Sequence, residues 1–142
     1  MKISTRGRYA VRVMVDMAEH ASGDYIPLKD IAERQEISLK YSEGIMIALS
    51  KSKLVDAVHG KGGGYKLNRD PEDYTVGEIL RTIEGDLAPV ACLGDSPKKC
   101  ARASECRTLP MWKDFYKLIN DFFDGITLKS LMKKSDGNDY II

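Results

Sequence analysis

Three cysteines lie within a stretch of fifteen residues, in the spacing Cys-x7-Cys-x5-Cys. Thiolate sulfur is the ligand type that iron–sulfur clusters and zinc ions favour in proteins. An odd number of cysteines argues against a framework of structural disulfides, because disulfides use cysteines in pairs. Cys92, Cys100 and Cys106 are therefore predicted to hold a metal centre, and a thiol switch without a cluster is the alternative.

A metal centre of this kind needs a fourth ligand beside the three thiolates. Asp95 and Glu105 lie in the same stretch and carry carboxylates. A residue of a partner subunit or an exogenous molecule would serve equally well. The residues alone leave these four sources open.

A second group of residues fits contact with DNA, and it begins at Ser38, a candidate N-cap for a helix. The first turn of this helix would reach base edges, because the major groove of DNA admits an α-helix. Lys40 and Tyr41 fit contacts to phosphates. Glu43 fits a hydrogen bond from a cytosine amino group, and a solvated surface carboxylate is the alternative. Gly44 destabilises this helix by about 1 kcal/mol relative to alanine.

The segment His59-Gly-Lys-Gly-Gly-Gly64 predicts a tight turn between two short strands at residues 54–58 and 65–67. His59 and Lys61 offer hydrogen-bond donors there. Gly62 and Gly63 would let the backbone approach a phosphate or enter the minor groove. The segment lacks the spacing of a phosphate-binding P-loop and no helix follows it, so nucleotide binding is excluded on these grounds.

The basic residues are concentrated in the first half of the chain. Up to residue 69 there are 12 Lys and Arg against 8 Asp and Glu, whereas the remainder has 10 against 13. This asymmetry fits a first half that meets a polyanion. Lys2, Arg6 and Arg8 lie near the start of the first predicted helix, where they would position DNA phosphates.

Hydrophobic periodicity predicts the elements that carry these residues. One amphipathic helix covers about residues 9–21, a second covers 27–35, and the third begins at Ser38. Two short helices joined by a tight turn form a helix-turn-helix, and the following hairpin forms a wing. Thr75-x-x-Glu78 is a capping box for a further helix that ends at Gly85. The polar positions interspersed along the first helix are Arg8, Arg12, Asp16 and Glu19.

A long aromatic helix is predicted after the cysteines, with an apolar stripe that runs from Trp112 to Ile126. After a complete winged domain, such a stripe has little left to cover it except a second copy of the chain, so dimerisation is favoured over intramolecular core. Thr127 is a candidate cap for a last short helix. The apolar positions of the stripe are Trp112, Phe115, Tyr116, Ile119, Phe122, Phe123 and Ile126.

The predicted fold is mainly α-helical with a small β-wing: a winged helix-turn-helix followed by a long C-terminal dimerisation helix. Residues 1–85 form the DNA-binding part, 86–110 a cysteine-containing sensor loop, and 111–142 the dimerisation helix and tail, all within one compact unit. No apolar run approaches the roughly 20 residues of a membrane span. The N-terminus lacks the pattern of a signal peptide, so a cytoplasmic location is expected. His20 and His59 are far apart and no catalytic constellation is present, which argues against an enzyme.

Several segments closely resemble the family of IscR, NsrR and CymR: MKISTRGRYAVRVM, ISLKYSE, GKGGGYKL, TVGEIL, and the three-cysteine loop followed by a long helix with a tryptophan. The match runs in order over nearly the whole chain. It implies a homodimeric winged-helix transcription regulator that binds a double-stranded DNA operator, with long helices that cross at the dimer interface. It also implies that Cys92, Cys100 and Cys106 ligate an iron–sulfur cluster, [2Fe–2S] or [4Fe–4S], which alters DNA recognition. Glu43 falls where the family switches its DNA specificity.

Three positions depart from the pattern of this family. Leu109 stands three residues after Cys106, where IscR-type members carry a histidine ligand. Arg8 stands where NsrR-type members use an aspartate ligand, and His59 stands where these proteins often place an arginine that reads the groove.

The three cysteines and the resemblance together predict a regulator that senses iron, redox or nitric oxide status through a cluster. The alternatives are a cluster-free regulator with a thiol or zinc switch and a module that binds only proteins.

Overall fold

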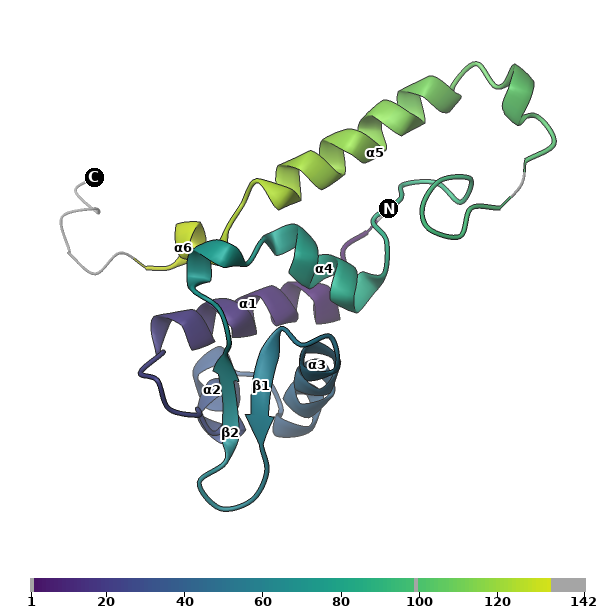
Figure 1. Cartoon of the computed structure of the whole chain (residues 1–142). Helices are drawn as coiled ribbons and strands as arrows, with labels where there is room; N and C mark the ends of the chain where they lie inside the picture. The colour runs from purple at the N-terminus through teal and green to yellow at the C-terminus, as the bar shows by residue number, and fades with distance from the viewer. Residues whose placement is uncertain (1, 99, 134–142) are drawn as a thin grey trace.

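The computed structural model describes residues 2–98 and 100–133, and the predicted C-terminal tail beyond residue 133 lies outside them. Figure 1 shows a winged domain from which one long helix projects, with the cysteine loop at the far end of that helix. The elements are α1 (Thr5–Glu19), α2 (Leu28–Gln35), α3 (Leu39–Lys51), β1 (Val55–Val58), β2 (Gly64–Leu67), the 3-10 helix η1 (Pro71–Asp73), α4 (Val76–Glu84), the 3-10 helix η2 (Ala103–Glu105), α5 (Leu109–Asp124) and α6 (Leu128–Leu131). This order confirms the predicted winged helix-turn-helix followed by a long helix.

Helices α2 and α3 form the helix-turn-helix, and capping residues set the turn between them. Glu36 ends α2 in the left-handed conformation, with φ 55°, and its backbone N–H donates to carbonyl groups of the last turn. The Ser38 hydroxyl accepts a hydrogen bond from the Tyr41 backbone N–H at 3.1 Å. The predicted N-cap is confirmed, and α3 therefore begins at Leu39.

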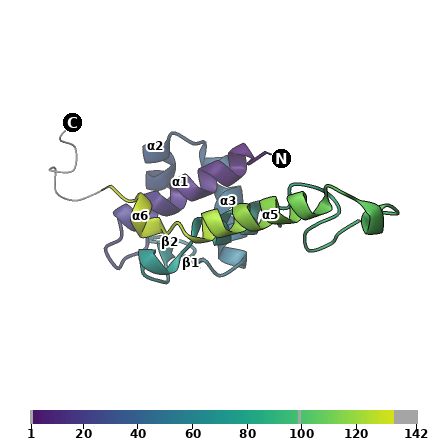
Figure 2. The ribbon, with the colours of Figure 1, turned by 90° about the horizontal axis from the view of Figure 1, so that it is seen from above.

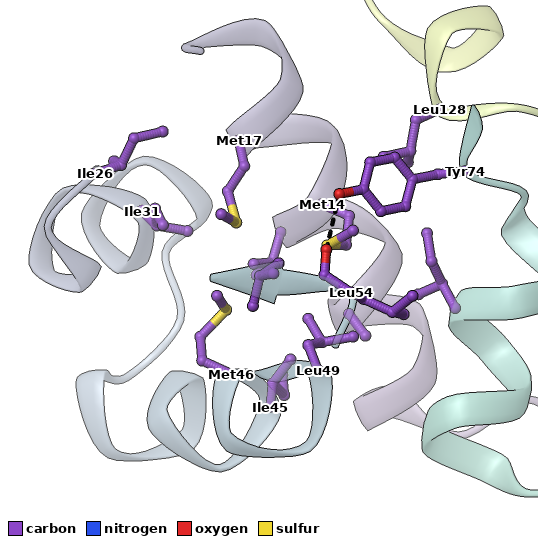
Figure 3. Close-up of a cluster of buried hydrophobic side chains, with 14 of the residues drawn as sticks. Met14, Met17, Ile26, Ile31, Ile45, Met46, Leu49, Leu54, Tyr74 and Leu128 are labelled. Atoms are coloured by element: carbon purple, nitrogen blue, oxygen red, sulfur yellow. Dashed lines mark hydrogen bonds between the residues drawn. The ribbon is translucent and has the colours of Figure 1, made fainter. Parts of the chain in front are cut away.

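One hydrophobic core joins α1, the helix-turn-helix and the base of the wing. Met14 and Met17 of α1 are fully buried, and Met46 of α3 lies across from them (Figure 3). Figure 3 also shows Leu128 of the α6 segment reaching this core beside Tyr74. The winged domain is therefore closed by a residue that follows the long helix.

The wing is a two-stranded antiparallel sheet in which Val55 pairs with Leu67 and Val58 with Gly64. Each strand lies within one residue of its predicted bounds: β1 begins after Leu54, and β2 begins before Tyr65. Sequence reasoning missed Ile26, which exchanges two backbone hydrogen bonds with Tyr65, at 2.8 and 2.9 Å. The segment before α2 thus adds a one-residue bridge to the edge of the sheet.

Asp16, one of the polar positions interspersed along the amphipathic helix α1, is only 2% exposed, whereas the polar positions of such a helix usually face solvent. The Arg34 guanidinium donates to both carboxylate oxygens, at 2.7 and 3.0 Å, and the Gln35 side-chain amide donates a further hydrogen bond at 2.9 Å. The same carboxylate raises the pKa of Arg34 through this hydrogen bond. A buried charge is tolerated only when it is paired, so this network fixes the end of α2 against α1.

Tyr74 connects the wing to the end of the chain. Its buried hydroxyl donates to the Leu54 carbonyl at 2.8 Å and accepts from the Asn68 backbone N–H at 3.0 Å. Its own carbonyl accepts from the Leu128 backbone N–H at 3.1 Å. Burial raises the pKa of Tyr74, so the neutral hydroxyl persists as a donor at neutral pH.

We expect Tyr74→Phe to lower the free energy of unfolding by about 1–2 kcal/mol. The phenyl ring fills the same space but leaves the Leu54 carbonyl and the Asn68 amide without this partner. Urea denaturation followed by circular dichroism measures the change. Tyr25→Phe is the matched control, since Tyr25 is only partly buried. Equal midpoints for the two variants would contradict a structural role for the Tyr74 hydroxyl.

Helix α4 begins with half of the predicted capping box. The Thr75 hydroxyl accepts from the Glu78 backbone N–H at 3.0 Å. The Glu78 carboxylate does not return to Thr75 as predicted; it binds the Arg69 guanidinium at 2.8 and 2.9 Å. Gly85 ends the helix with φ 85°, as predicted. A competing charged donor therefore outweighs the backbone N–H of the cap.

Helix α5 runs across α4 and continues beyond it (Figure 1), and Figure 2 shows α5 from above, extending past α3 toward the cysteine loop. Ile119 is buried in a second small core together with Val76 and Leu80 of α4, and Phe123 and Ile126 pack against this core. The Thr127 hydroxyl caps α6 by accepting from the Ser130 backbone N–H, as predicted. Across the described residues, no helix has both the length and the apolar character needed to cross a membrane.

Candidate DNA interface and cysteine loop

The outer face of α3 is the first part of the candidate interface. Ser42, Ile45, Met46 and Leu49 are buried against the winged-domain core, which leaves the opposite side of the helix to solvent. At 3.6 residues per turn, this opposite side carries Lys40, Glu43, Gly44, Ile47 and Lys51. We call these five residues the outer face. Lys40 and Glu43, predicted as DNA contacts, are both exposed there.

The N-terminal basic residues are placed by α1, beside α3, which is the second or recognition helix of the helix-turn-helix. The Arg6 guanidinium donates to the Gly44 carbonyl of α3 at 3.1 Å. Arg8 turns back onto its own helix, where it donates to the Thr5 hydroxyl at 2.8 Å. Lys2 is exposed ahead of α1. The structure thus brings Arg6 to α3, and it keeps Arg8 and Lys2 on the surface at the start of α1.

Tyr41 has a packing role that sequence reasoning missed. Its ring meets the ring of Tyr9 edge to face, with the centroids 5.8 Å apart. The Arg12 guanidinium lies 4.9 Å from the centroid of the same Tyr9 ring. Tyr41 is still 40% exposed, so it braces α3 against α1 while its remaining surface faces solvent.

The wing loop carries the other predicted contacts and extends from the end of the sheet (Figure 1). His59, Lys61 and Gly62 are exposed, and Gly63 is partly buried. A Cβ on Gly63 would lie 2.2 Å from the Val58 carbonyl oxygen, so the hairpin itself requires glycine at this position. Gly62 has φ 78°, which also favours glycine. The glycines therefore have a structural reason that is independent of DNA.

The three cysteines line the same hollow, which has a volume of about 630 Å³ and lies between the loop and the start of α5. Cys100 is exposed, and Cys92 and Cys106 are partly buried. Within residues 2–98 and 100–133, no three His, Cys, Asp or Glu side chains are close enough together to hold a metal ion. Three thiols that line one hollow are the right kind of ligand, in a common place, for a thiolate-bound cluster. They would have to move closer together to hold one.

The surroundings of the hollow favour thiolate. The Thr108 hydroxyl lies 3.5 Å from the Cys106 sulfur, and hydrogen bonds from Thr108 lower the pKa of that thiol, with a smaller contribution from the charge of Arg102. Lys98 and Lys113 also line the hollow. Positive charge and hydrogen-bond donors stabilise the anionic sulfur that metal ligation requires.

The candidate fourth ligands differ in position. Leu109 lines the hollow with the cysteines but offers no donor atom, and neither Asp95 nor Glu105 lines it. Glu105 lines a neighbouring hollow with Cys106. Asp86 organises the start of the loop by accepting hydrogen bonds from the Asp95 and Ala88 backbone N–H groups, both at 3.0 Å, and these lower the pKa of Asp86.

The last residue of α4 links the cysteine loop to the N-terminal end of α1. Glu84 accepts a hydrogen bond from the Ser4 backbone N–H at 3.1 Å, and its other oxygen accepts from the Ser4 hydroxyl. Ser4 is also the N-cap of α1, and its hydroxyl accepts from the Gly7 backbone N–H at 2.9 Å. A Cβ on Gly7 would lie 3.0 Å from the Glu84 carboxylate. The start of the loop is therefore tied to the helix that carries Arg6.

Helix α5 presents a second apolar face to solvent. Met111 is 52% exposed, Leu118 64% and Phe122 61%, and Phe115 lies between them at 39%. We call these four residues the α5 stripe. Their spacing of four, three and four residues places them on one side of the helix. Sequence reasoning missed Met111 and Leu118, although their four-three-four spacing with Phe115 and Phe122 was an available signal. It also did not separate these exposed residues from Ile119 and Phe123, which pack into the second small core.

Comparisons with known proteins agree with this arrangement. The model of the Rrf2 family, described as an iron-dependent transcriptional regulator, matches residues 3–134. The chain is similar to the HTH-type transcriptional regulator IscR of Vibrio campbellii, with 38% identity over 96% of this chain and 80% of the relative. Among solved structures, it is similar to T. potens IscR, with 34% identity over 99% of this chain and 96% of that one at a TM-score of 0.72.

A second solved structure, that of CymR, the global cysteine regulator of B. subtilis, shares 31% identity over 96% of this chain and 99% of its own, with a TM-score of 0.75. The family match, the relative and both structures cover nearly the whole chain, and they include the recognition helix, the wing and the long helix together. The chain therefore belongs to the Rrf2 family of helix-turn-helix transcriptional regulators, which bind DNA and are not enzymes.

Proposed function

We propose that this regulator binds its operator as a homodimer and that an iron–sulfur cluster on Cys92, Cys100 and Cys106 modulates the binding. One observation carries the proposal: all three cysteines line one hollow beside the start of α5. The fourth ligand then comes from Asp95, Glu105, the partner subunit or an exogenous molecule, because Leu109 has no donor atom. Operator binding places the protein in the cytoplasm.

The proposed division of labour follows the chain. Residues 1–85 bind DNA, with the outer face of α3 in the major groove and the wing loop at the adjacent minor groove. Residues 86–110 form the sensor loop, and the segment from 111 onward pairs two copies. The proposed contacts are Lys2, Arg6, Arg8, Ser38, Lys40, Tyr41, Glu43, His59, Lys61, Gly62 and Gly63.

The α5 stripe supports the dimer. Four large apolar side chains in one row on a projecting helix are an unusual exposure for a monomeric protein. A second α5 crossing the first would cover the row with the same residues, as the twofold symmetry of a homodimer requires. We therefore propose that the α5 stripe is the centre of the dimer interface.

Modulation of DNA binding needs a path from the loop to α3, and hydrogen bonds support one. Glu84 ends α4 immediately before the loop and holds Ser4, the cap of α1. Arg6, two residues further on, donates to the Gly44 carbonyl on α3. A bound cluster would link the three thiolates to one another, and oxidation, nitric oxide or loss of iron would remove this link. A displacement of the loop start then reaches the recognition helix through Glu84 and Ser4.

Glu84→Gln should reduce the ratio of operator affinities between the cluster-loaded and cluster-free protein by about threefold. The two Ser4 donors use different carboxylate oxygens, and the amide replaces one of these oxygens by an NH2 group that cannot accept. Fluorescence anisotropy with each form of the variant gives this ratio. Glu33→Gln, which removes an exposed carboxylate from α2, is the matched control. An unchanged ratio in Glu84→Gln would show that the coupling takes another route.

Anaerobic purification tests the cluster directly. We expect a brown protein with an absorption band in the visible region and with iron matched by acid-labile sulfide. Operator binding is then compared before and after removal of the iron. A colourless protein that contains no iron after attempted reconstitution, yet binds DNA, would contradict the cluster and leave the DNA-binding function in place.

A cluster-free thiol or zinc switch is the second candidate function. The separation of the three thiols, which share a hollow without gathering around one point, favours the thiol switch over either metal centre, because an oxidant modifies thiols one at a time. Zinc content and the effect of a thiol oxidant on operator affinity distinguish this switch from the cluster.

A further inference from the structure

Among the described residues of the winged domain, Ile47 is the most exposed large apolar residue, with 63% of its surface open to solvent. It lies at the centre of the outer face of α3, one helical turn after Glu43 and two after Lys40. The buried side of α3 lies opposite, so the Ile47 side chain makes no part of the core. Burial within this chain therefore does not account for an isoleucine at this position.

Helix formation does not account for Ile47 or its neighbour Gly44 either. Isoleucine loses side-chain freedom in a helix, and glycine is the least favourable residue there apart from proline. A Cβ added at Gly44 would meet no atom within 4 Å, so packing within the chain does not demand glycine. Two adjacent outer-face positions thus depart from what the helix itself favours, which is typical of residues chosen for an external contact.

We infer that Ile47 packs against the C5-methyl group of a thymine in the operator and that Gly44 gives the base-pair edge room to approach the α3 backbone. The thymine methyl is the apolar group that the major groove presents, and aliphatic side chains recognise it by contact. This inference rests on the proposed entry of α3 into the major groove. It assigns specificity for thymine to a residue outside the polar contacts proposed above.

The position on α3 fits this role. Lys40 and Lys51 lie on the same face, on either side of Ile47 along the helix, and their positive charges fit the phosphates that border the groove. Arg6 lies over the Gly44 carbonyl from the side of α1, where it also fits a phosphate. An apolar side chain flanked by basic groups on one helix face matches a groove with a methyl group between two phosphate backbones.

Replacement of thymine by deoxyuridine tests the inference, because it removes the methyl group and keeps the base pair. The operator is first selected from random duplexes with the full-length protein, and each thymine is then replaced in turn. Affinity is measured by anisotropy at fixed salt. We expect one thymine in each half-site whose replacement weakens binding by about fourfold, the effect of one buried methyl-sized group.

Replacement of this thymine by deoxyuridine should not change the operator affinity of the Ile47→Ala variant. This variant already binds the unmodified operator about fourfold more weakly than the unaltered protein. Leu131→Ala is the matched control, because Leu131 is an exposed leucine on α6 and should retain the full sensitivity to the methyl group. Gly44→Ala provides a second readout: its thermal midpoint should rise because alanine favours the helix, whereas its operator affinity should fall.

The outcomes separate this inference from the proposed function. Selective, salt-dependent operator binding without a methyl-sensitive thymine would overturn the role of Ile47 and leave the proposed function intact. A methyl-sensitive thymine that remains so in Ile47→Ala would also overturn it. Failure to select any duplex would contradict both the proposed function and the inference.

Discussion

Leu118→Glu should convert the protein from a dimer to a monomer and weaken binding to a two-half-site operator by about a hundredfold or more, since linking two binding modules raises overall affinity by about 10²–10⁴. Leu118 is 64% exposed at the middle of the α5 stripe. A glutamate there would meet its counterpart across a twofold axis in an apolar interface. Burial of two like charges without partners is strongly unfavourable.

Sedimentation velocity gives the oligomeric state of Leu118→Glu, and anisotropy compares duplexes with one and two half-sites. The variant should bind both duplexes with similar affinity, whereas the unaltered protein should prefer two half-sites. Lys117→Glu is the control for this variant, because it places the same carboxylate one residue away, outside the α5 stripe, where the Lys117 side chain is 76% exposed. A Leu118→Glu protein that stays dimeric would place the interface elsewhere on the molecule.

Cys100→Ala should reduce bound iron and sulfide to background while the fold and non-specific DNA binding persist. Cys100 is exposed and belongs to neither hydrophobic core, so alanine leaves no cavity behind. Loss of one of the three thiolates leaves at most two sulfur ligands on this loop, which is half of the four protein ligands that a cluster commonly has.

Iron and sulfide analysis, the visible spectrum and circular dichroism of the anaerobic protein test this variant together. Ser96→Ala, in the same loop, is the control and should keep both iron and colour. A retained chromophore in Cys100→Ala would exclude Cys100 as a ligand. An unfolded variant would show that the loop has a structural role in place of a sensory one.

Local patterns were sufficient to predict most of the fold. The Ser38 and Thr75 caps act within three residues, and the glycines of the wing fix a short turn, so neighbouring residues alone specify these features. The burial of Asp16 has no local signal, because its partner, Arg34, is 18 residues away. Periodicity treats every charged residue as exposed, and it has no access to a pairing that only the tertiary fold creates.

The two faces of α5 show the same limit. Both carry apolar residues at helical spacing, so the sequence predicts a broad stripe without indicating which side the winged domain covers. Packing on α4 decides, and it buries Ile119 while leaving Leu118 exposed. The cysteines were predicted by their spacing, but the tie between Glu84 and Ser4 spans 80 residues and no local pattern indicates it.

The winged-domain core also contains sulfur, in a different chemical setting from the loop. Met14, Met17 and Met46 are fully buried, so an oxidant reaches their thioethers only when the domain opens. Cys100 meets the same oxidant directly at the surface. The free energy of opening the winged domain thus determines how much later the core methionines are oxidised to sulfoxides than the loop cysteine is modified. A more stable fold would lengthen the interval in which the protein is chemically altered and still intact.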